Sequence, residues 1–324
     1  MAAPFDVVGI GNALVDVIVQ RDDVFLASES LEKGSMALIE TDRAVSLYTS
    51  MGPGIEMSGG SAANTMTGVA SFGGRACYIG KVNDDELGQA FAHDLRAMGV
   101  NFPLPPGVHE MPTGRSLIVV TPDAQRTMST YLGVSSLLGP DDVDPDVVAA
   151  GLVLYMEGYL WDRDAAKDAY RRAARVAHAA DRLVSLSLSD SFCVDRHRAD
   201  FRRLVTDDVD LLFGNEDELL SLYEVDDFAE AVRHVRADCR MAAVTRGASG
   251  SIIITPDDLI TVPAEPVSSV VDTTGAGDLY AAGFLFGLTS DRDLAECGRL
   301  GSIAAAEVIG HVGARPLVPL HRLA

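Results

Sequence analysis

A glycine-rich segment between two aspartates carries the strongest chemical signal in the sequence. Residues 272–278 read Asp-Thr-Thr-Gly-Ala-Gly-Asp and precede an apolar, helix-forming stretch. The small residues Gly275, Ala276 and Gly277 let the backbone approach a ligand, and their N–H groups at a helix N-terminus would attract phosphate. Asp278, in the first turn, suits a general base that takes a proton from an attacking hydroxyl. The alternative is an ordinary helix capped by a threonine.

A second small-residue segment, Ser58–Asn64, also opens a predicted helix. Its glycines, Gly60 among them, would expose backbone N–H groups, and Asn64 in the first turn would bond sugar hydroxyls. The alternative is a loop in which Ser61 simply caps the helix, and the segment alone does not decide between the two.

A third segment, Gly9–Asp16, invites comparison with a dinucleotide-binding loop. The third glycine of that fingerprint is replaced by Leu14, and a strand-like run follows where a helix is required, so the fingerprint fails. Asn12 and Asp16 are better interpreted as polar groups at the end of a strand. A carboxylate can accept two hydrogen bonds, which fits a vicinal diol, whereas the alternative is an aspartate in a turn.

Weaker signals lie further along the chain. Asn215 and Glu218 follow a short strand, where open α/β sheets place ligands, and would hold Mg²⁺ through water; the alternative is a capped helix with an acidic first turn. Thr245, Gly247 and Gly250 join two predicted strands and would touch a nucleotide phosphate or ribose, unless they form only a glycine-rich hairpin.

Two single residues complete the candidates, and the lysines exclude one class of site. Arg126 would clamp phosphate, unless it is a solvated charge, and Phe192 would stack on a flat base, unless it belongs to the core. None of the three lysines stands in a Gly-Lys-Ser/Thr sequence, so a Walker A loop is absent. Phosphoryl transfer in this chain would depend on backbone N–H groups, Mg²⁺ and arginine.

Composition narrows the class of protein. The 324 residues carry a net charge of −21, and no Lys/Arg run offers a basic patch, which argues against nucleic-acid partners and anionic membranes. No apolar run is long enough to span a bilayer, and the N-terminal residues lack the basic region of a signal peptide. The four cysteines are scattered, which favours free thiols in a cytoplasmic protein.

The elements that must position these residues alternate between strand and helix for most of the chain. This alternation predicts an α/β fold with a mostly parallel sheet covered by helices on both faces. Two stretches break the alternation: residues 15–20 with 35–40, and residues 113–121 with 126–132. The second predicts a β-hairpin with a polar turn at residues 122–125. Such inserted β segments often form a lid over a site.

Taken together, these motifs resemble the ribokinase-like (PfkB) family of carbohydrate and nucleoside kinases. The 272–278 segment resembles its C-terminal signature, Gly59 to Gly88 its N-terminal one, and the Asn215–Glu218 spacing its NxxE element. The resemblance implies one domain over residues 1–324, a three-layer α/β/α fold with a small β-sheet lid from about 15–40 and 113–132. It also implies ATP and Mg²⁺, with K⁺ used by some members, and a monomer or homodimer that binds small molecules.

Within the family, the chain most resembles the adenosine kinases. That resemblance assigns Asn12, Asp16, Gly60, Ser61 and Asn64 to the ribose, with the 5′-hydroxyl as phosphoryl acceptor. It also assigns Phe192 to the purine, Arg126 to the lid, and the tail segment 304–315 to the ATP adenine. The alternatives are a kinase of ribose, fructose or a keto-deoxy sugar, a non-catalytic nucleoside-binding protein on the same fold, and, more remotely, a nicotinamide-dependent oxidoreductase.

Overall fold

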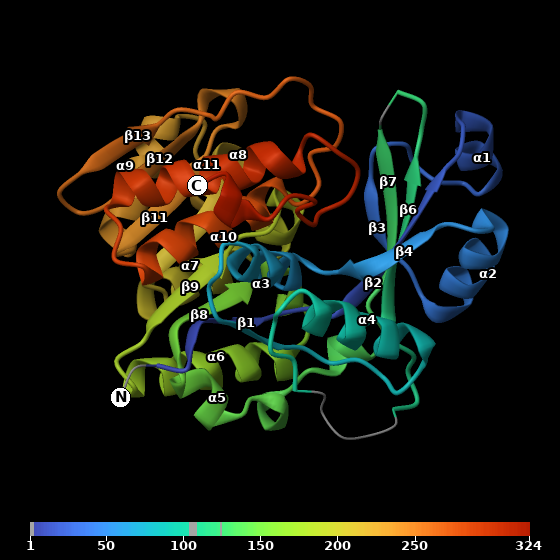
Figure 1. Cartoon of the computed structure of the whole chain (residues 1–324), viewed down its shortest axis with the longest axis horizontal. Helices are drawn as coiled ribbons and strands as arrows, with labels where there is room; N and C mark the ends of the chain where they lie inside the picture. Colours follow the sequence, from blue (N-terminus) through green and yellow to red (C-terminus); the bar gives the residue numbers. More distant parts are fainter. Residues whose placement is uncertain (1–2, 104–108, 124) are drawn as a thin grey trace.

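The computed structural model describes residues 3–103, 109–123 and 125–324 and contains a large and a small β-sheet (Figure 1). The strands of the large sheet follow the order β13 (Leu259–Val262), β12 (Ser251–Ile254), β11 (Met241–Thr245), β10 (Leu211–Asn215), β9 (Leu183–Ser187), β8 (Gly151–Glu157), β1 (Phe5–Ile10) and β5 (Ala76–Ile79). Neighbours from β11 to β5 are parallel, whereas β12 and β13 are antiparallel additions. The carboxyl ends of the parallel strands therefore meet at one edge.

Helices cover both faces of the large sheet (Figure 1). One layer contains α3 (Ser61–Ser71), α4 (Glu86–Ala97), α10 (Ala276–Thr289) and α11 (Leu294–Val308); the other contains α5 (Pro145–Ala149), α6 (Asp164–Ala179), α7 (Ser191–Asp207), α8 (Glu216–Tyr223) and α9 (Phe228–Asp238). Successive residues of β1 serve different cores, because Val7 packs with the first layer and Val8 with the second. The predicted three-layer α/β/α fold is confirmed.

The small sheet stands beside the large one and is called the lid below (Figure 1). Its strands follow the order β3 (Met36–Leu38), β7 (Arg126–Tyr131), β6 (Gly114–Val120), β2 (Leu14–Gln20) and β4 (Ile55–Gly59). Strands β6 and β7 pair as the predicted hairpin, although Ala124 of its turn lies outside the described residues. The strand β4 was not predicted, because its short run mixes glutamate, serine and glycine with two apolar residues.

The lid has a core of its own. Helices α1 (Asp23–Ser28) and α2 (Thr41–Met51) pack on its outer face through a cluster that includes Val17, Val19 and Leu117. Alternate residues on the same strands, Asp16 and Ile118, point to the opposite face, toward the large sheet. One face of the lid therefore packs against α1 and α2, and the other face lines a cleft.

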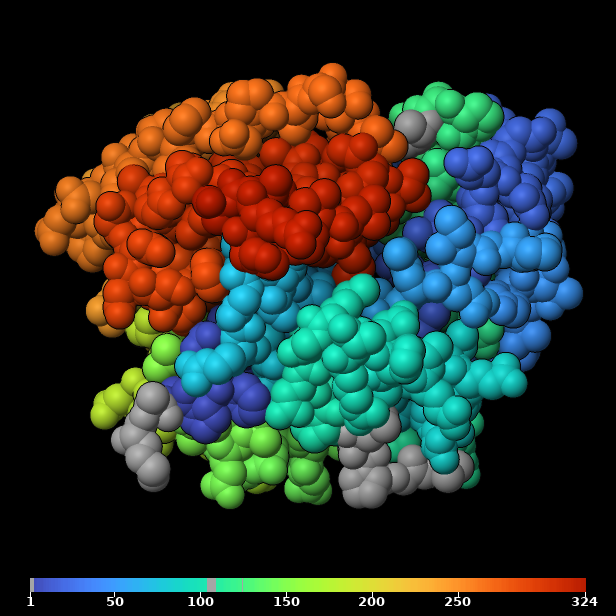
Figure 2. All heavy atoms as spheres, viewed as in Figure 1, coloured from blue at the N-terminus to red at the C-terminus, as the bar shows by residue number. Residues whose placement is uncertain are grey.

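The C-terminal segments close over the layer that contains α3 and α10. In Figure 2 the red C-terminal atoms lie directly against the light-blue segment that contains α3. The backbone N–H of Leu320 donates to the Ser71 hydroxyl at 2.9 Å, and an added Cβ at Gly283 would stand 2.3 Å from the Leu300 carbonyl oxygen. These contacts pack the C-terminal segments against the end of α3 and the middle of α10.

The four cysteines are buried and unpaired, as predicted. Burial raises the pKa of Cys77, Cys193 and Cys297 to about 12 and that of Cys239 to about 11. The thiols are therefore protonated at neutral pH. In the described stretches of the chain, no helix has the length and apolar character required to cross a membrane.

Candidate active site

A cleft of about 1130 Å³ lies between the lid and the carboxyl edge of the large sheet. Single small-molecule sites usually enclose roughly 300–1,000 Å³, so this cleft has room for two ligands side by side. The predicted site residues that line it are Asn12, Asp16, Gly60, Ser61, Asn64, Asn215, Glu218, Thr245, Gly247, Gly250, Gly275, Ala276, Gly277 and Asp278. Residues separated by more than 250 positions in the sequence thus share one cavity.

Asp278 lies in the first turn of α10 and faces the N-terminus of α3 across the cleft. Its Oδ1 accepts a hydrogen bond from the Ser61 hydroxyl at 2.6 Å, and its Oδ2 accepts one from the Asn64 amide at 2.9 Å. Burial raises the pKa of Asp278, and these two donors and the charge of Arg315 oppose that rise. Ser61 and Asn64, expected to bind sugar hydroxyls, thus engage the carboxylate beside them, and an alcohol entering here would meet all three groups.

The glycine-rich turn before α10 leaves peptide N–H groups open to the cleft. Gly275 adopts φ +78°, and an added Cβ there would approach that of Ala314 to 2.7 Å, so both conformation and space require glycine. An added Cβ at Gly277 meets nothing within 4 Å. The Ala276 N–H donates to the Thr273 carbonyl at 3.2 Å, whereas those of Gly275 and Gly277 find no acceptor among the described residues. Two of the three predicted donors are therefore free for an anion.

Asp16 projects from β2 of the lid toward Asp278. Burial raises its pKa to about 7; the charges of Arg315 and Arg126 lower it, and that of Asp278 adds to the rise. An added Cβ at Gly59 would stand 2.4 Å from the Asp16 carboxylate, so this glycine gives the carboxylate its space. In the part of the chain that the structure describes, Asp16 accepts no hydrogen bond. Both of its oxygens are available to ligand hydroxyls.

A buried glutamate that the sequence analysis missed organises the end of β1. Glu157, the last residue of β8, accepts the N–H of Asn12 and the N–H of Ala62, each at 2.7 Å. Burial raises the pKa of Glu157 to about 7, which these backbone donors oppose. The Asn12 side-chain oxygen accepts from the Ser135 hydroxyl at 3.0 Å. Glu157 could have been found from the sequence, because it is a single acidic residue directly after the apolar run 152–156.

Asn215 and Glu218 bond to each other at the start of α8. The Glu218 N–H donates to the Asn215 side-chain oxygen at 2.9 Å, and the Asn215 backbone N–H donates to the Glu218 carboxylate at 3.1 Å. The Asn215 side-chain amide also donates to that carboxylate at 2.7 Å. This is the reciprocal helix cap that was the alternative interpretation. Among the described residues no group of three or more acidic, histidine or cysteine side chains could hold a metal. Contact of this pair with Mg²⁺ through water stays a prediction.

The turn after β11 brings the remaining phosphate candidates to the cleft. Thr245 ends β11 in register with Asn215 at the end of β10. Gly247 and Gly250 adopt φ +54° and +85°, and an added Cβ at Gly250 would stand 2.1 Å from the Val262 carbonyl oxygen. The backbone thus turns tightly at this edge of the cleft, close to the N-terminus of α8.

Two predicted residues do not line the cleft. The Phe192 side chain is 54% exposed and stacks under the Arg196 guanidinium, 4.5 Å from ring centroid to Cζ, because α7 turns it toward solvent. The aromatic residues that line the cleft include Tyr159, whose hydroxyl donates to the Ser189 carbonyl at 3.3 Å, together with Phe213 and Tyr280. Arg126 forms an ion pair with Asp272 instead, since that carboxylate offers a nearby anion.

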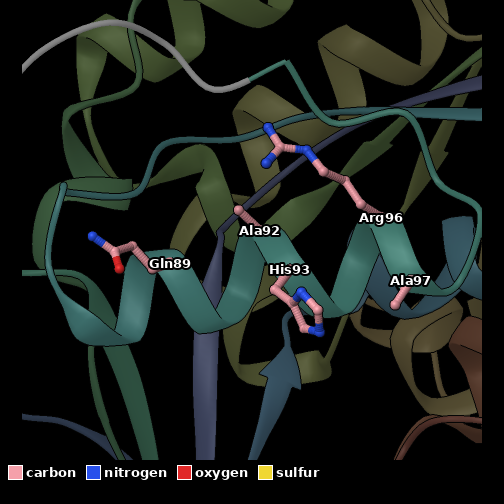
Figure 3. Close-up of a pocket in the computed structure, with 5 residues that line it drawn as sticks. All are labelled: Gln89, Ala92, His93, Arg96 and Ala97. Atoms are coloured by element: carbon pink, nitrogen blue, oxygen red, sulfur yellow. The ribbon is translucent and has the colours of Figure 1, made fainter.

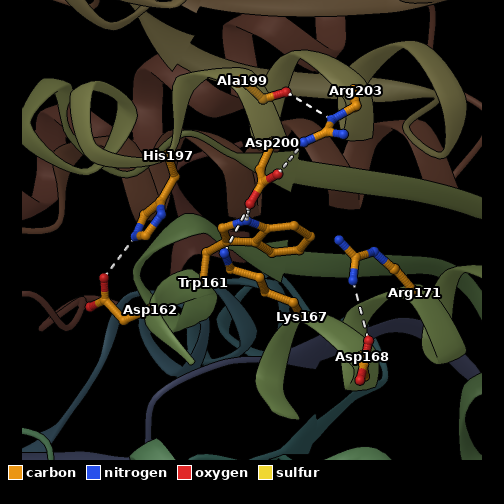
Figure 4. Close-up of polar contacts among 9 residues, drawn as sticks. All are labelled: Trp161, Asp162, Lys167, Asp168, Arg171, His197, Ala199, Asp200 and Arg203. Atoms are coloured by element: carbon orange, nitrogen blue, oxygen red, sulfur yellow. Dashed lines mark hydrogen bonds and ion pairs between the residues drawn. The ribbon is translucent and has the colours of Figure 1, made fainter. Parts of the chain in front are cut away.

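Two further polar features have a structural explanation. Between α6 and α7, Asp200 accepts from Lys167 at 2.9 Å and from the Trp161 indole at 3.3 Å, which ties the helices together at the outer surface (Figure 4). A second hollow of about 470 Å³ lies over α4 alone (Figure 3). Its lining residues, among them His93, all come from one helix among the described residues.

The comparison with protein families decides the class of this cleft. The family of pfkB carbohydrate kinases matches residues 54–320. The chain belongs to this family. Most residues that line the cleft lie within the matched range, and the resemblance inferred from the sequence is confirmed.

Individual relatives in the family carry two kinds of name. Adenosine kinase from Sinorhizobium meliloti is 54% identical, with a TM-score of 0.94 over 99% of this chain and 98% of that one. A probable sugar kinase from Rhizobium etli is 49% identical, with the same TM-score and the same coverage of both chains. An uncharacterised sugar kinase from Archaeoglobus fulgidus is 30% identical over 78% of this chain and 98% of its own length. The pfkB protein described here is therefore an ATP-dependent kinase of a sugar or nucleoside.

Proposed function

We propose that this kinase phosphorylates the 5′-hydroxyl of adenosine, converting ATP and adenosine to ADP and AMP. The observation that carries the proposal is the carboxylate of Asp278 beside the open N–H groups of Gly275 and Gly277 in a cleft large enough for two ligands. Asp278 would accept the hydroxyl proton as the oxygen attacks the γ-phosphorus of ATP. The N–H groups would stabilise the charge on the transferred phosphoryl group, and loss of one such donor typically costs about 3 kcal/mol in barrier.

The ribose would bind at the facing ends of β2 and α3. Asp16 has two free carboxylate oxygens and would accept the hydroxyls of a vicinal diol. The Asn64 side-chain oxygen is buried without a partner among the described residues, so it offers one more acceptor. Asn12, Gly60 and Ser61 complete the set that surrounds this position.

The apolar face of the lid supports a nucleoside in preference to a free sugar. The side chains that the lid region contributes to the cleft include six large apolar ones: Leu14, Met36, Leu38, Ile118, Met128 and Leu132. A purine buries flat apolar area against such a surface, whereas a hydroxylated sugar would leave polar groups without partners there. Tyr159 adds an aromatic ring to the same cavity.

The nucleotide would occupy the other end of the cleft, along the turn that contains Thr245, Gly247 and Gly250. Asn215 and Glu218 would hold Mg²⁺ through water, and that ion supplies positive charge to the ATP phosphates when bound. Closure of the lid would exclude water and so limit unproductive hydrolysis of ATP.

The test is an ADP-release assay with adenosine, inosine, guanosine, cytidine, ribose and fructose as acceptors, with the phosphorylated product identified by mass and by NMR of the phosphorylated carbon. We expect the highest kcat/KM with adenosine and phosphorylation at C5′. Preference for ribose or fructose would favour the second candidate, a sugar kinase, which the names of the Rhizobium and Archaeoglobus relatives support. Nucleoside binding without ADP release would indicate a non-catalytic binding protein.

A further inference from the structure

Arg315, in the loop after α11, is a buried cation to which the proposed reaction assigns no role. Its side chain is only 4% exposed and does not line the cleft. Its Nε donates to the Ser58 carbonyl at 3.1 Å, and its Nη1 donates to the Ala63 carbonyl at 2.9 Å and to the Thr67 hydroxyl at 2.7 Å. All three acceptors belong to residues 58–67, the segment that carries Gly60, Ser61 and Asn64 into the cleft.

The guanidinium of Arg315 has no direct ion pair. In the described part of the chain no carboxylate oxygen lies within 4.0 Å of it, and its Nη2 is buried without a hydrogen-bond partner. Burial of an unpaired charge is costly, and it lowers the pKa of Arg315 to about 10. The acidic groups that face it and oppose this shift are Asp16, Asp278, Asp94 and the Tyr78 hydroxyl.

The same charge acts in return on the two carboxylates of the cleft. Arg315 is the largest influence that lowers the pKa of Asp16, followed by Arg126, while burial and Asp278 raise it. It is the charged group that lowers the pKa of Asp278, next to the hydrogen bonds from Ser61 and Asn64. A carboxylate must be ionised to accept a proton or two hydroxyls, so the charge behind α3 favours the reactive form of both groups.

We propose that Arg315 is the positioning residue of the cleft: it clamps residues 58–67 beneath the substrate and serves as the shared buried counter-charge of Asp16 and Asp278. The inference rests on the proposed function, in which these two carboxylates receive the hydroxyls of the nucleoside. It adds a role for the C-terminal loop, which reaches the reacting centre from behind α3 and not through the cleft.

Two substitutions separate charge from clamping. Arg315→Met removes both, and Arg315→Lys keeps a charge but loses the fork that spans the Ser58 and Ala63 carbonyls. Measured with the best acceptor, kcat/KM should rise with pH as the two carboxylates ionise, and this acidic limb should lie about one pH unit higher in Arg315→Met than in wild type. The variant should therefore lose about tenfold in kcat/KM at pH 6 and largely recover it at pH 8.5. In Arg315→Lys the limb should stay near its wild-type position while KM rises. Arg322→Met, at an exposed site in the same C-terminal segment, is the matched control.

A second readout does not depend on turnover. Carboxyl ¹³C NMR of the ligand-free protein, with Asp16→Asn and Asp278→Asn used for assignment, should show both carboxyls titrating at higher pH in Arg315→Met than in wild type. If no acceptor yields ADP, the proposed function fails, yet this titration still tests the counter-charge. A pH-independent loss of activity with unchanged carboxyl titration would overturn the proposal. Arg315→Lys keeps the charge, so the proposal predicts no shift of its acidic limb. If Arg315→Met does not fold, a shifted acidic limb in folded Arg315→Lys would therefore overturn the proposal.

Discussion

At the scale of single residues, the carboxylate of Asp278 has hydrogen-bond donors on both oxygens before any ligand is present. Ser61 and Asn64 donate to the two oxygens of Asp278, and Glu157 holds the backbone of Asn12 in place. Asp16 differs, because its oxygens accept nothing from the described residues. We therefore expect Asp278 to govern the chemical step and Asp16 to govern binding.

Replacement of the proposed base should stop chemistry and leave binding largely intact. In Asp278→Asn the side chain keeps its size but cannot accept a proton, so kcat should fall by about 10²–10⁴-fold. Adenosine affinity, measured by calorimetry, should change by only a few fold. Asp257→Asn, in the exposed turn between β12 and β13, serves as the control. Turnover near the wild-type rate in Asp278→Asn would disprove the assignment.

Nucleoside binding should depend on pH through Asp16. Its pKa is raised to about 7, and only the ionised form can accept hydrogen bonds with both oxygens, so affinity should increase as pH rises through 7. The ionised fraction grows about tenfold between pH 6 and pH 8, and the association constant should follow it. Calorimetry at pH 6, 7 and 8 should show this increase in wild type and a weaker, flat response in Asp16→Asn. An equally steep response in the variant would assign the titration to another group.

At the scale of elements, periodic patterns predicted the large sheet and its helices well. The apolar run at Ala76–Ile79 predicts a strand and the pattern at Glu216–Tyr223 predicts a helix, and both agree with the structure to the residue. The sequence pattern does not predict the two elements of residues 41–59, α2 and β4; β4 becomes a strand only through its pairing with β2. The β-branched run 267–271 forms no strand, since two prolines just before it lack N–H donors and the hairpin already ends the sheet at β13.

The site was predictable where its residues lie in short motifs and unpredictable where contacts connect distant segments. The spacing within 272–278 and 58–64 was enough to nominate the residues around Asp278. The ion pair of Arg126 with Asp272 and the hydrogen bonds of Arg315 to α3 join positions that are 146 and about 250 residues apart. No local pattern encodes such partners, and the outward rotation of Phe192 likewise depends on how α7 begins.

The entry into α3 requires a glycine for two reasons that can be separated. Gly60 adopts φ +91°, and an added Cβ would stand 2.1 Å from the Asn12 carbonyl oxygen. Gly73, just beyond the other end of α3, adopts φ +97° but has open space around it. Gly73→Ala should therefore show only the conformational cost, about 1–2 kcal/mol, whereas Gly60→Ala should lose roughly 2–3 kcal/mol more and most of its activity. Urea unfolding of both variants measures the difference, and equal losses would contradict the predicted collision.

At the scale of the whole molecule, an ion pair links the lid to the glycine-rich turn before α10. Arg126 on β7 pairs with Asp272, and the same carboxylate accepts the N–H groups of Thr274 at 3.0 Å and Gly313 at 2.8 Å. The lid, the turn before α10 and the C-terminal loop therefore meet at one buried side chain.

Removal of this link should loosen the lid, and it should also raise the pKa of Asp16 further, because the Arg126 charge lowers that pKa. In Arg126→Met the lid should spend more time open, so ATP hydrolysis without acceptor should increase several-fold relative to phosphorylation of adenosine. Small-angle X-ray scattering should report a larger radius of gyration for the ligand-free variant than for wild type. Arg43→Met, which removes an ion pair wholly within the lid region, is the control. An unchanged radius and an unchanged hydrolysis ratio would show that other contacts hold the lid.

The burial of every native thiol makes the protein suitable for site-selective labelling. Cys77, Cys193, Cys239 and Cys297 should resist maleimide reagents at neutral pH, so a fluorophore attached to one new cysteine on α1 would report from that position alone. Opening and closing of the lid could then be followed in real time, by energy transfer or quenching, without first replacing the native cysteines.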